Sequence, residues 1–329
     1  MLLSVATPVS FVSGATLVRH ADPARGAYVL RTGDVEAVVT LPGGESLTVA
    51  RLGAGSVFGE MALIELGTCT ATVRAASDVD GWFIAHEDFR AVVSQRGAVA
   101  VRLQHAVTMI LAQKLAALNS KLIAAPAPED RAARRVPEGS DPLARIARAR
   151  KAPFDAGGFL PRLPVFQHFS ADEIDEAIAS ASYLEVARGQ ALFTAGGEAR
   201  SAFIVVRGAI EIVAAEGDCE RRMAVLGPGQ LVGFLSVLAE RAHSSHAFAR
   251  EGAVLLEFSA QVFRDLYFGS TGASARLRHA VQASLLASIA RTNRSLTRLI
   301  SQAKLDASRR ESAELEAAYH GQLTTAAPA

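Results

Sequence analysis

The stretch Phe58-Gly59-Glu60-Met61-Ala62-Leu63, followed by Thr68-Cys69-Thr70-Ala71-Thr72-Val73, decides the fold of this chain. A glycine that permits a tight turn precedes an acid, a short apolar turn of helix and a strand of small residues. Backbone amides at the start of such a turn, together with one carboxylate, suit a sugar and a phosphate. The stretch therefore predicts a binding turn for a hydroxylated, phosphorylated ligand.

A second copy of the same pattern occurs later in the chain. Gly33 and Gly208 lie in matching runs 175 residues apart, and Gly55 and Gly229 lie in matching runs 174 residues apart. The offset persists into the region where each copy is expected to become helical. A register held over this length indicates two copies of one domain.

Each copy begins with short β-segments and ends in helices. Apolar and polar residues alternate over 35–39 and 210–213, which is typical of half-buried strands. Apolar residues then recur at steps of three and four over 102–122 and 277–300, which predicts helices. Two readings of these apolar stripes are open. They pack within the chain, on the β-structure or on each other, or they form the seam of a symmetric homodimer.

The order of these segments resembles the cyclic-nucleotide-binding domain family, which includes the catabolite activator protein and regulatory subunits of the cyclic-AMP-dependent kinase. The resemblance implies a mainly β fold with α-helices (α+β): two tandem jelly-roll-like β-rolls, each closed by C-terminal helices. Only the second copy has the family's lead-in helix, which begins near Leu163. The expected divisions are domain 1 at 1–123, a Pro-, Ala- and Arg-rich linker at 124–153, domain 2 at 154–300, and a C-terminal helix with a flexible tail at 301–329.

In that family a phosphate-binding cassette uses a glycine turn, a glutamate for the ribose 2′-hydroxyl and an arginine for the phosphate. The resemblance assigns the domain 1 cassette to Phe58, Gly59, Glu60, Met61, Ala62, Cys69 and Thr70. Cys69 stands at the arginine position, so the strongest charge is missing; a charge-assisted bond contributes about 1.5–3 kcal/mol. Whether Arg31, Arg51 or Arg74 compensates from another strand is left open.

The cassette of the second copy departs further from the family pattern; its corresponding residues are Gly233, Phe234, Leu235, His243 and Ser244. An apolar ring stands at the glutamate position, so usual cyclic AMP binding is not expected there. Phe234 either fills the empty pocket as core, the favoured reading, or lines a pocket for a flatter ligand. His243 and His246 lack the further ligands that a metal site needs, and no metal is expected.

Composition excludes several other classes of function. The 329 residues hold 34 Lys and Arg against 33 Asp and Glu, so no overall basic field favours nucleic acid. Cys69 and Cys219 match no metal or disulfide spacing. No apolar run of membrane-spanning length, no basic leader, no helix-turn-helix and no catalytic constellation is recognised. We therefore expect a cytoplasmic protein that is not an enzyme and has no DNA or membrane partner and no cofactor.

Two functions from different classes follow. The first is a regulatory sensor with a weak or atypical cyclic-nucleotide site in domain 1. It would act as a homodimer or through another protein partner, by way of helices 102–122 and 277–300. The alternative is a ligand-independent interaction or assembly module built on the same fold.

Overall fold

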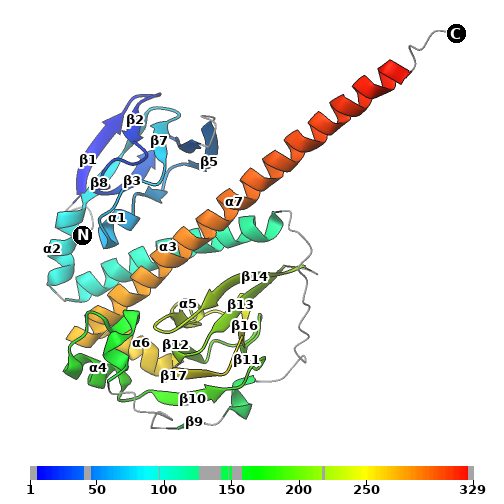
Figure 1. Cartoon of the computed structure of the whole chain (residues 1–329). Coiled ribbons are helices and arrows are strands. Elements are labelled where there is room, and N and C mark those ends of the chain that lie inside the picture. Colours follow the sequence, from blue (N-terminus) through cyan, green and yellow to red (C-terminus); the bar gives the residue numbers. More distant parts are fainter. Residues whose placement is uncertain are drawn as a thin grey trace.

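The computed structural model describes residues 6–40, 46–95, 97–125, 142–146, 148–149, 158–216 and 219–324 (Figure 1). Two β-rolls follow one another along the chain. The first consists of β1 (Ala6–Phe11), β2 (Thr16–Val18), β3 (Gly26–Thr32), β4 (Val35–Thr40), β5 (Ser46–Leu52), β6 (Val57–Phe58), β7 (Thr72–Ala75) and β8 (Val79–Ala85), with α1 (Met61–Ile64) between β6 and β7. The second consists of β10 (Ser182–Val186), β11 (Ala191–Phe193), β12 (Ser201–Arg207), β13 (Ile210–Glu216), β14 (Cys219–Leu226), β15 (Leu231–Val232), β16 (Ser245–Ala249) and β17 (Ala253–Ser259), with α5 (Phe234–Leu238) between β15 and β16.

The two rolls have the same strand topology. The sheets of the first roll run in the orders β1-β8-β3-β6 and β2-β7-β4-β5. Those of the second run β10-β17-β12-β15 and β11-β16-β13-β14, which is the same order at each equivalent strand. All neighbouring strands in these sheets are antiparallel. The two-copy fold predicted from the repeat is confirmed.

Helices flank each roll in matching positions. α2 (His86–Ser94) and α3 (Ala98–Ala124) follow the first roll, and α6 (Ala260–Phe268) and α7 (Gly272–Thr324) follow the second. The second roll is also preceded by η3 (Leu160–Arg162), η4 (Pro164–Phe166) and α4 (Ala171–Ile178). The Ser170 side chain caps α4 in a capping box with Glu173. The lead-in helix expected for the second copy is therefore present.

Part of the stretch expected to be a linker packs on the second roll. η2 (Pro142–Arg145) and β9 (Arg148–Ala149) lie in it, and β9 pairs with β10 as an added edge strand. Leu143 and Ile146 are only 7% and 5% exposed, because they pack in the hydrophobic cluster of that roll. The remainder, 126–141, 147 and 150–157, lies outside the described residues, as does the tail from residue 325.

The closing helices of the two copies pack against each other within the chain (Figure 1). Gln104 of α3 accepts a hydrogen bond from the Arg278 guanidinium of α7 at 2.8 Å, and Thr108 accepts one from the Gln282 amide at 3.3 Å. Each pair is 174 residues apart in sequence, so the helices are parallel and in the register of the repeat. The apolar stripes share one cluster that includes Leu111 and Leu285. Internal pairing, left open by the sequence, is thus observed.

The homodimer remains a prediction, since one chain does not test it. α7 continues unbroken past residue 300, where the expected domain boundary lay, and projects beyond both rolls (Figure 1). Leu296 is half-buried and Ile300 is 37% exposed. None of the helices among the described residues is long and apolar enough to cross a membrane.

Candidate functional site

The cassette of the first roll begins with a turn that only glycine tolerates. Gly59 has a φ of 75°, in the left-handed region, and a Cβ at this position would lie 2.6 Å from the carbonyl oxygen of Gly26. The turn ends strand β6 and directs the chain into α1. Glu60 is the N-cap residue of this helix. The glycine therefore fixes where the acid side chain begins.

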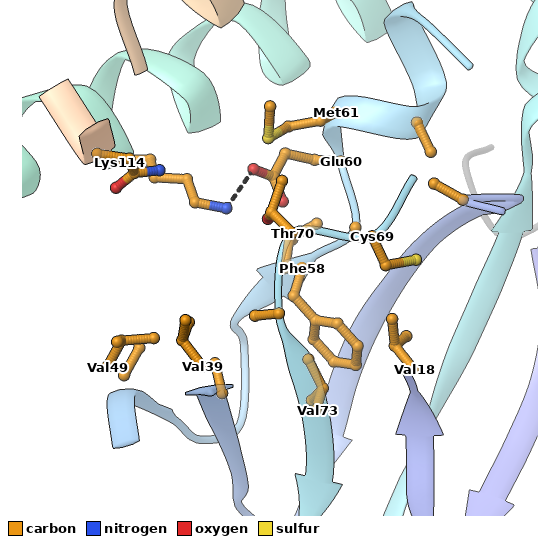
Figure 2. Close-up of a pocket in the computed structure, with 18 of the residues that line it drawn as sticks. Val18, Val39, Val49, Phe58, Glu60, Met61, Cys69, Thr70, Val73 and Lys114 are labelled. Atoms are coloured by element: carbon orange, nitrogen blue, oxygen red, sulfur yellow. Dashed lines mark hydrogen bonds and ion pairs between the residues drawn. The ribbon is translucent and has the colours of Figure 1, made fainter. Parts of the chain in front are cut away.

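Glu60 is fully buried and forms an ion pair with a residue of the closing helix. Its Oε1 lies 2.6 Å from the Nζ of Lys114 on α3, and its side chain is 1% exposed against 42% for the lysine (Figure 2). Its Oε2 is also buried and has no hydrogen-bond partner among the described residues. A buried acceptor without a donor is unfavourable by about 1–3 kcal/mol. The carboxylate thus has one oxygen satisfied by the protein and one available for a donor from a ligand.

Sequence reasoning did not identify Lys114. The signal was present, because Lys114 is the one Lys, Arg, Asp or Glu between Arg102 and Lys121 in a helical stretch with an apolar stripe. A single charged side chain beside an apolar stripe often forms an ion pair, because charged residues are rarely buried without a partner of opposite charge. The sequence could not show that this partner was Glu60, 54 residues earlier.

Glu60 and Lys114 line an open cavity of about 1770 Å³ between the first roll, α3 and α7. Small-ligand sites usually occupy about 300–1,000 Å³, so the cavity has room for a ligand and water. Its walls are largely apolar and include Val18, Val39 and Phe58 (Figure 2). Its charged lining residues are Arg19, Arg25, Lys114, Lys121 and Arg294 against Asp22, Glu60 and Glu65. Five cations against three acids favour an anionic ligand.

The position expected to hold an arginine has no cation. Cys69 donates its backbone amide to the Asp22 carbonyl, and its carbonyl accepts from the Ala21 amide, both at 2.8 Å. Burial, and then the charge of Asp22, raise the pKa of the Cys69 thiol, so it is neutral at physiological pH. Figure 2 shows Thr70 beside Glu60, and Cys69 on the side of Glu60 away from Lys114.

The three arginines considered as replacements do not line the cavity. Arg31 pairs with Asp80 at 3.2 Å and Arg51 with Glu36 at 3.0 Å. Arg74 lies on β7 with an exposed side chain. The cation nearest to the cassette carboxylate therefore comes from a helix and not from a neighbouring strand.

The backbone of α1 is partly committed to its own turn. The Ala62 amide, expected to face a ligand, donates to the Gly59 carbonyl at 3.0 Å. The Ala62 carbonyl lies 2.6 Å from the Nδ1 of His86, the first residue of α2. Met61 is half-buried and lines the cavity. The short helix is thus tied to the helix that follows the roll.

The equivalent region of the second roll is filled by aromatic rings. Gly233 makes the same turn, with a φ of 75°, but the next residue, Phe234, is 7% exposed and belongs to the main hydrophobic cluster. His243 is 5% exposed, and its ring stacks on Phe193 with 3.7 Å between ring centroids. Burial lowers the pKa of His243 to about 4, so the ring is neutral at pH 7. Leu235 is half-buried, leaving a mainly apolar interior.

The remaining polar residues of this second cassette do not converge on a ligand site. Ser244 is exposed. The Nδ1 of His246 accepts a hydrogen bond from the Ala195 amide at 3.3 Å. In the described part of the chain, no group of three or more His, Cys, Asp or Glu residues is placed to hold a metal ion.

Comparison with known proteins agrees with this architecture. The family described as "Cyclic nucleotide-binding domain" matches residues 8–96 and 183–270, which together make up more than half of the chain. Glutaminase 1 of Bradyrhizobium diazoefficiens is 34% identical over 119 residues, covering 36% of this chain and 19% of that protein. The cyclic AMP receptor protein of Thermus thermophilus is 30% identical over 105 residues, covering 32% of this chain and 47% of that protein. The chain thus spans less than half the length of both relatives.

Among solved structures, the regulatory domain of Toxoplasma gondii PKA with cAMP is 16% identical, with a TM-score of 0.33, and the match covers 87% of this chain and 86% of that one. The regulatory subunit of a cAMP-independent protein kinase A from Trypanosoma brucei is 15% identical, with a TM-score of 0.34, and the match covers 91% of this chain and 85% of that one.

Proposed function

The chain belongs to the cyclic nucleotide-binding domain family, and from this membership we propose that it is a regulatory protein whose first roll binds a cyclic nucleotide. The second roll then serves as a structural partner that holds the closing helices. The proposal assigns one ligand site to two copies of the domain.

The observation that supports this most strongly is the state of Glu60. A fully buried carboxylate with one unpartnered oxygen, in a cavity with more cations than acids, matches a ligand that carries both a hydroxyl and a negative charge. A ribose 2′-hydroxyl can donate to Oε2. The apolar walls provide a surface on which a base can pack.

The second roll has the opposite character. The interior position beside Gly233 holds the Phe234 ring, and His243 and Phe193 stack close to the glycine. A ribose hydroxyl placed there would meet carbon atoms instead of an acceptor, and losing its bonds to water would be unfavourable. This supports the proposal that the second cassette does not bind cyclic AMP in the usual way.

The closing helices are placed to respond to the ligand. α3 provides Lys114 to the cavity, and α7 provides Ala290 and Arg294, so one cavity contacts the helices of both copies. The two helices are joined by buried hydrogen bonds at Gln104 and Thr108. A ligand with different affinity for two positions of α3 would shift α7 with it. We propose this movement as the regulatory output.

Thermal unfolding with added cyclic AMP or cyclic GMP tests the site. We expect at least one to raise the melting temperature of the wild-type protein, because a ligand that binds only the folded state stabilises it. Glu60→Gln should abolish the shift by removing the charged acceptor. Glu65→Gln, which removes an acid from the rim of the same cavity, is the matched control and should keep the shift. Equal shifts in all three proteins would place the ligand elsewhere.

A second candidate function is a ligand-independent assembly module. The in-register pairing of α3 and α7 favours it, since this joint is complete without a ligand. A wild-type protein that shows no shift with either nucleotide, and no heat of binding by calorimetry, would support assembly over sensing.

A further inference from the structure

The cavity of the first roll has cations on both sides, Arg19 and Arg25 from the roll and Lys114, Lys121 and Arg294 from the helices. The one that contacts Glu60, Lys114, lies on the helix side. On the opposite side stands the neutral thiol of Cys69, close enough to Asp22 for that carboxylate to raise the thiol's pKa. An anionic group approaching from there would meet a negative charge. An anion entering from the α3 side would meet the ammonium of Lys114.

Lys114 has capacity for a second partner. An ammonium group carries three N–H donors, and in this structure one of them is directed at Glu60 Oε1. The lysine side chain is 42% exposed, whereas the Glu60 side chain is 1% exposed. The pair therefore presents its positive member to the cavity. In contrast Lys121, two helical turns further along α3, donates to the Val49 carbonyl at 3.2 Å.

We propose that Lys114 is the phosphate-binding residue of this site, acting from the closing helix in place of the cation that position 69 lacks. This inference rests on the proposed function and adds the residue that selects an anionic ligand. Lys114 bridges the ligand and the protein. One N–H stays on Glu60 and neutralises it, while the others point to a phosphate oxygen.

The chemistry of a cyclic nucleotide places both groups within reach of one lysine. The 2′-hydroxyl and the 3′-oxygen of the cyclic phosphate are on adjacent ring carbons, so a ribose hydroxyl on Glu60 Oε2 brings the phosphate next to the carboxylate. Lys114 Nζ is 2.6 Å from the other oxygen of that carboxylate. Anion recognition would thereby be coupled directly to α3 and, through it, to α7.

The test compares cyclic AMP with adenosine, which keeps the base and the 2′-hydroxyl but lacks the phosphate. Dissociation constants from calorimetry, or from competition with a fluorescent cyclic AMP, give a preference ratio of adenosine Kd over cyclic AMP Kd. We expect Lys114→Gln to lower this ratio about tenfold, because it removes one charge-assisted contact at a partly exposed site. Lys114→Arg should restore most of the preference. Lys121→Gln removes the same charge from the same cavity and should change the ratio less than twofold.

The outcomes separate this inference from the proposed function. If the wild-type protein binds neither compound, both fail. If it binds cyclic AMP and the ratio of Lys114→Gln stays at the wild-type value, Lys114 does not contact the phosphate, while the nucleotide site stands. Should Lys114→Gln be unstable, the wild-type protein provides a second measurement: its ratio should fall as the salt concentration rises, because salt screens a contact made by a partly exposed ammonium group. A ratio that is the same at low and high salt would also overturn the inference.

Discussion

Gly59 in the first roll and Gly233 in the second turn the chain at the same φ of 75°, and each leads into a helix of one turn or slightly more. The residue after the turn differs: Glu60 is buried against a lysine, whereas Phe234 is buried in the main hydrophobic cluster. An apolar ring is satisfied by packing alone. A carboxylate in the same place needs a cation and donors, because burying it unpaired is unfavourable by several kcal/mol.

This difference extends to the closing helices. Lys114 on α3 corresponds, 174 residues on, to Ser288 on α7, whose hydroxyl donates to the Ser284 carbonyl of its own helix. At corresponding positions the first copy thus has an acid and a lysine, and the second has a phenylalanine and a small polar residue. The two positions are expected to be interdependent within each copy.

The largest expected effect comes from exchanging one member of the pair in the second copy. Phe234→Glu should lower the free energy of unfolding by about 3–5 kcal/mol, because it buries a carboxylate where the corresponding helix position offers no cation. Adding Ser288→Lys should recover part of the loss, whereas Ser288→Lys alone should change stability little. Chemical denaturation of the four proteins gives the coupling energy as a double-mutant cycle. A coupling energy near zero would show that the two helix positions are not equivalent.

A smaller effect is expected from acid, and it arises in the second copy. The pKa of His243 is lowered by burial to about 4, below its ordinary value of 6.5. Between these values the unfolded chain binds a proton that the folded chain does not, so stability falls as the pH decreases through this window. The full loss, reached below the folded-state pKa, is roughly 3 kcal/mol.

Denaturation at several pH values between 7 and 4 measures this contribution. His243→Phe keeps an aromatic ring against Phe193 and should remove that part of the acid sensitivity. His20→Gln, which removes an exposed histidine from the first roll, is the control and should follow the wild-type curve. If His243→Phe follows the wild-type curve as well, protonation of His243 does not limit stability.

The sequence predicted the two rolls because the repeat fixes the register of strands, turns and helices together. It also predicted the turn at Gly59 and the departure from the pattern at Phe234. It did not predict the ion pair of Glu60 with Lys114, because the two residues meet only after the helix has packed on the roll. The register between α3 and α7 depends on Arg278 reaching Gln104, a contact across 174 residues that no local pattern contains.

The smallest expected effect comes from making the first cassette closer to the family pattern. Cys69→Arg should tighten cyclic AMP binding about tenfold if the new guanidinium reaches the phosphate. Asp22 lies beside this position and would compete for the arginine, so the gain should be larger in Cys69→Arg with Asp22→Asn than in Cys69→Arg alone. Calorimetry of both variants, with Asp22→Asn as the control, measures each step.

The arginine of Cys69→Arg would also duplicate the proposed role of Lys114. Its gain should therefore be greater in the Lys114→Gln background than in the wild type, because one phosphate contact is then missing. An equal gain in both backgrounds would mean that position 69 and Lys114 act on different parts of the ligand.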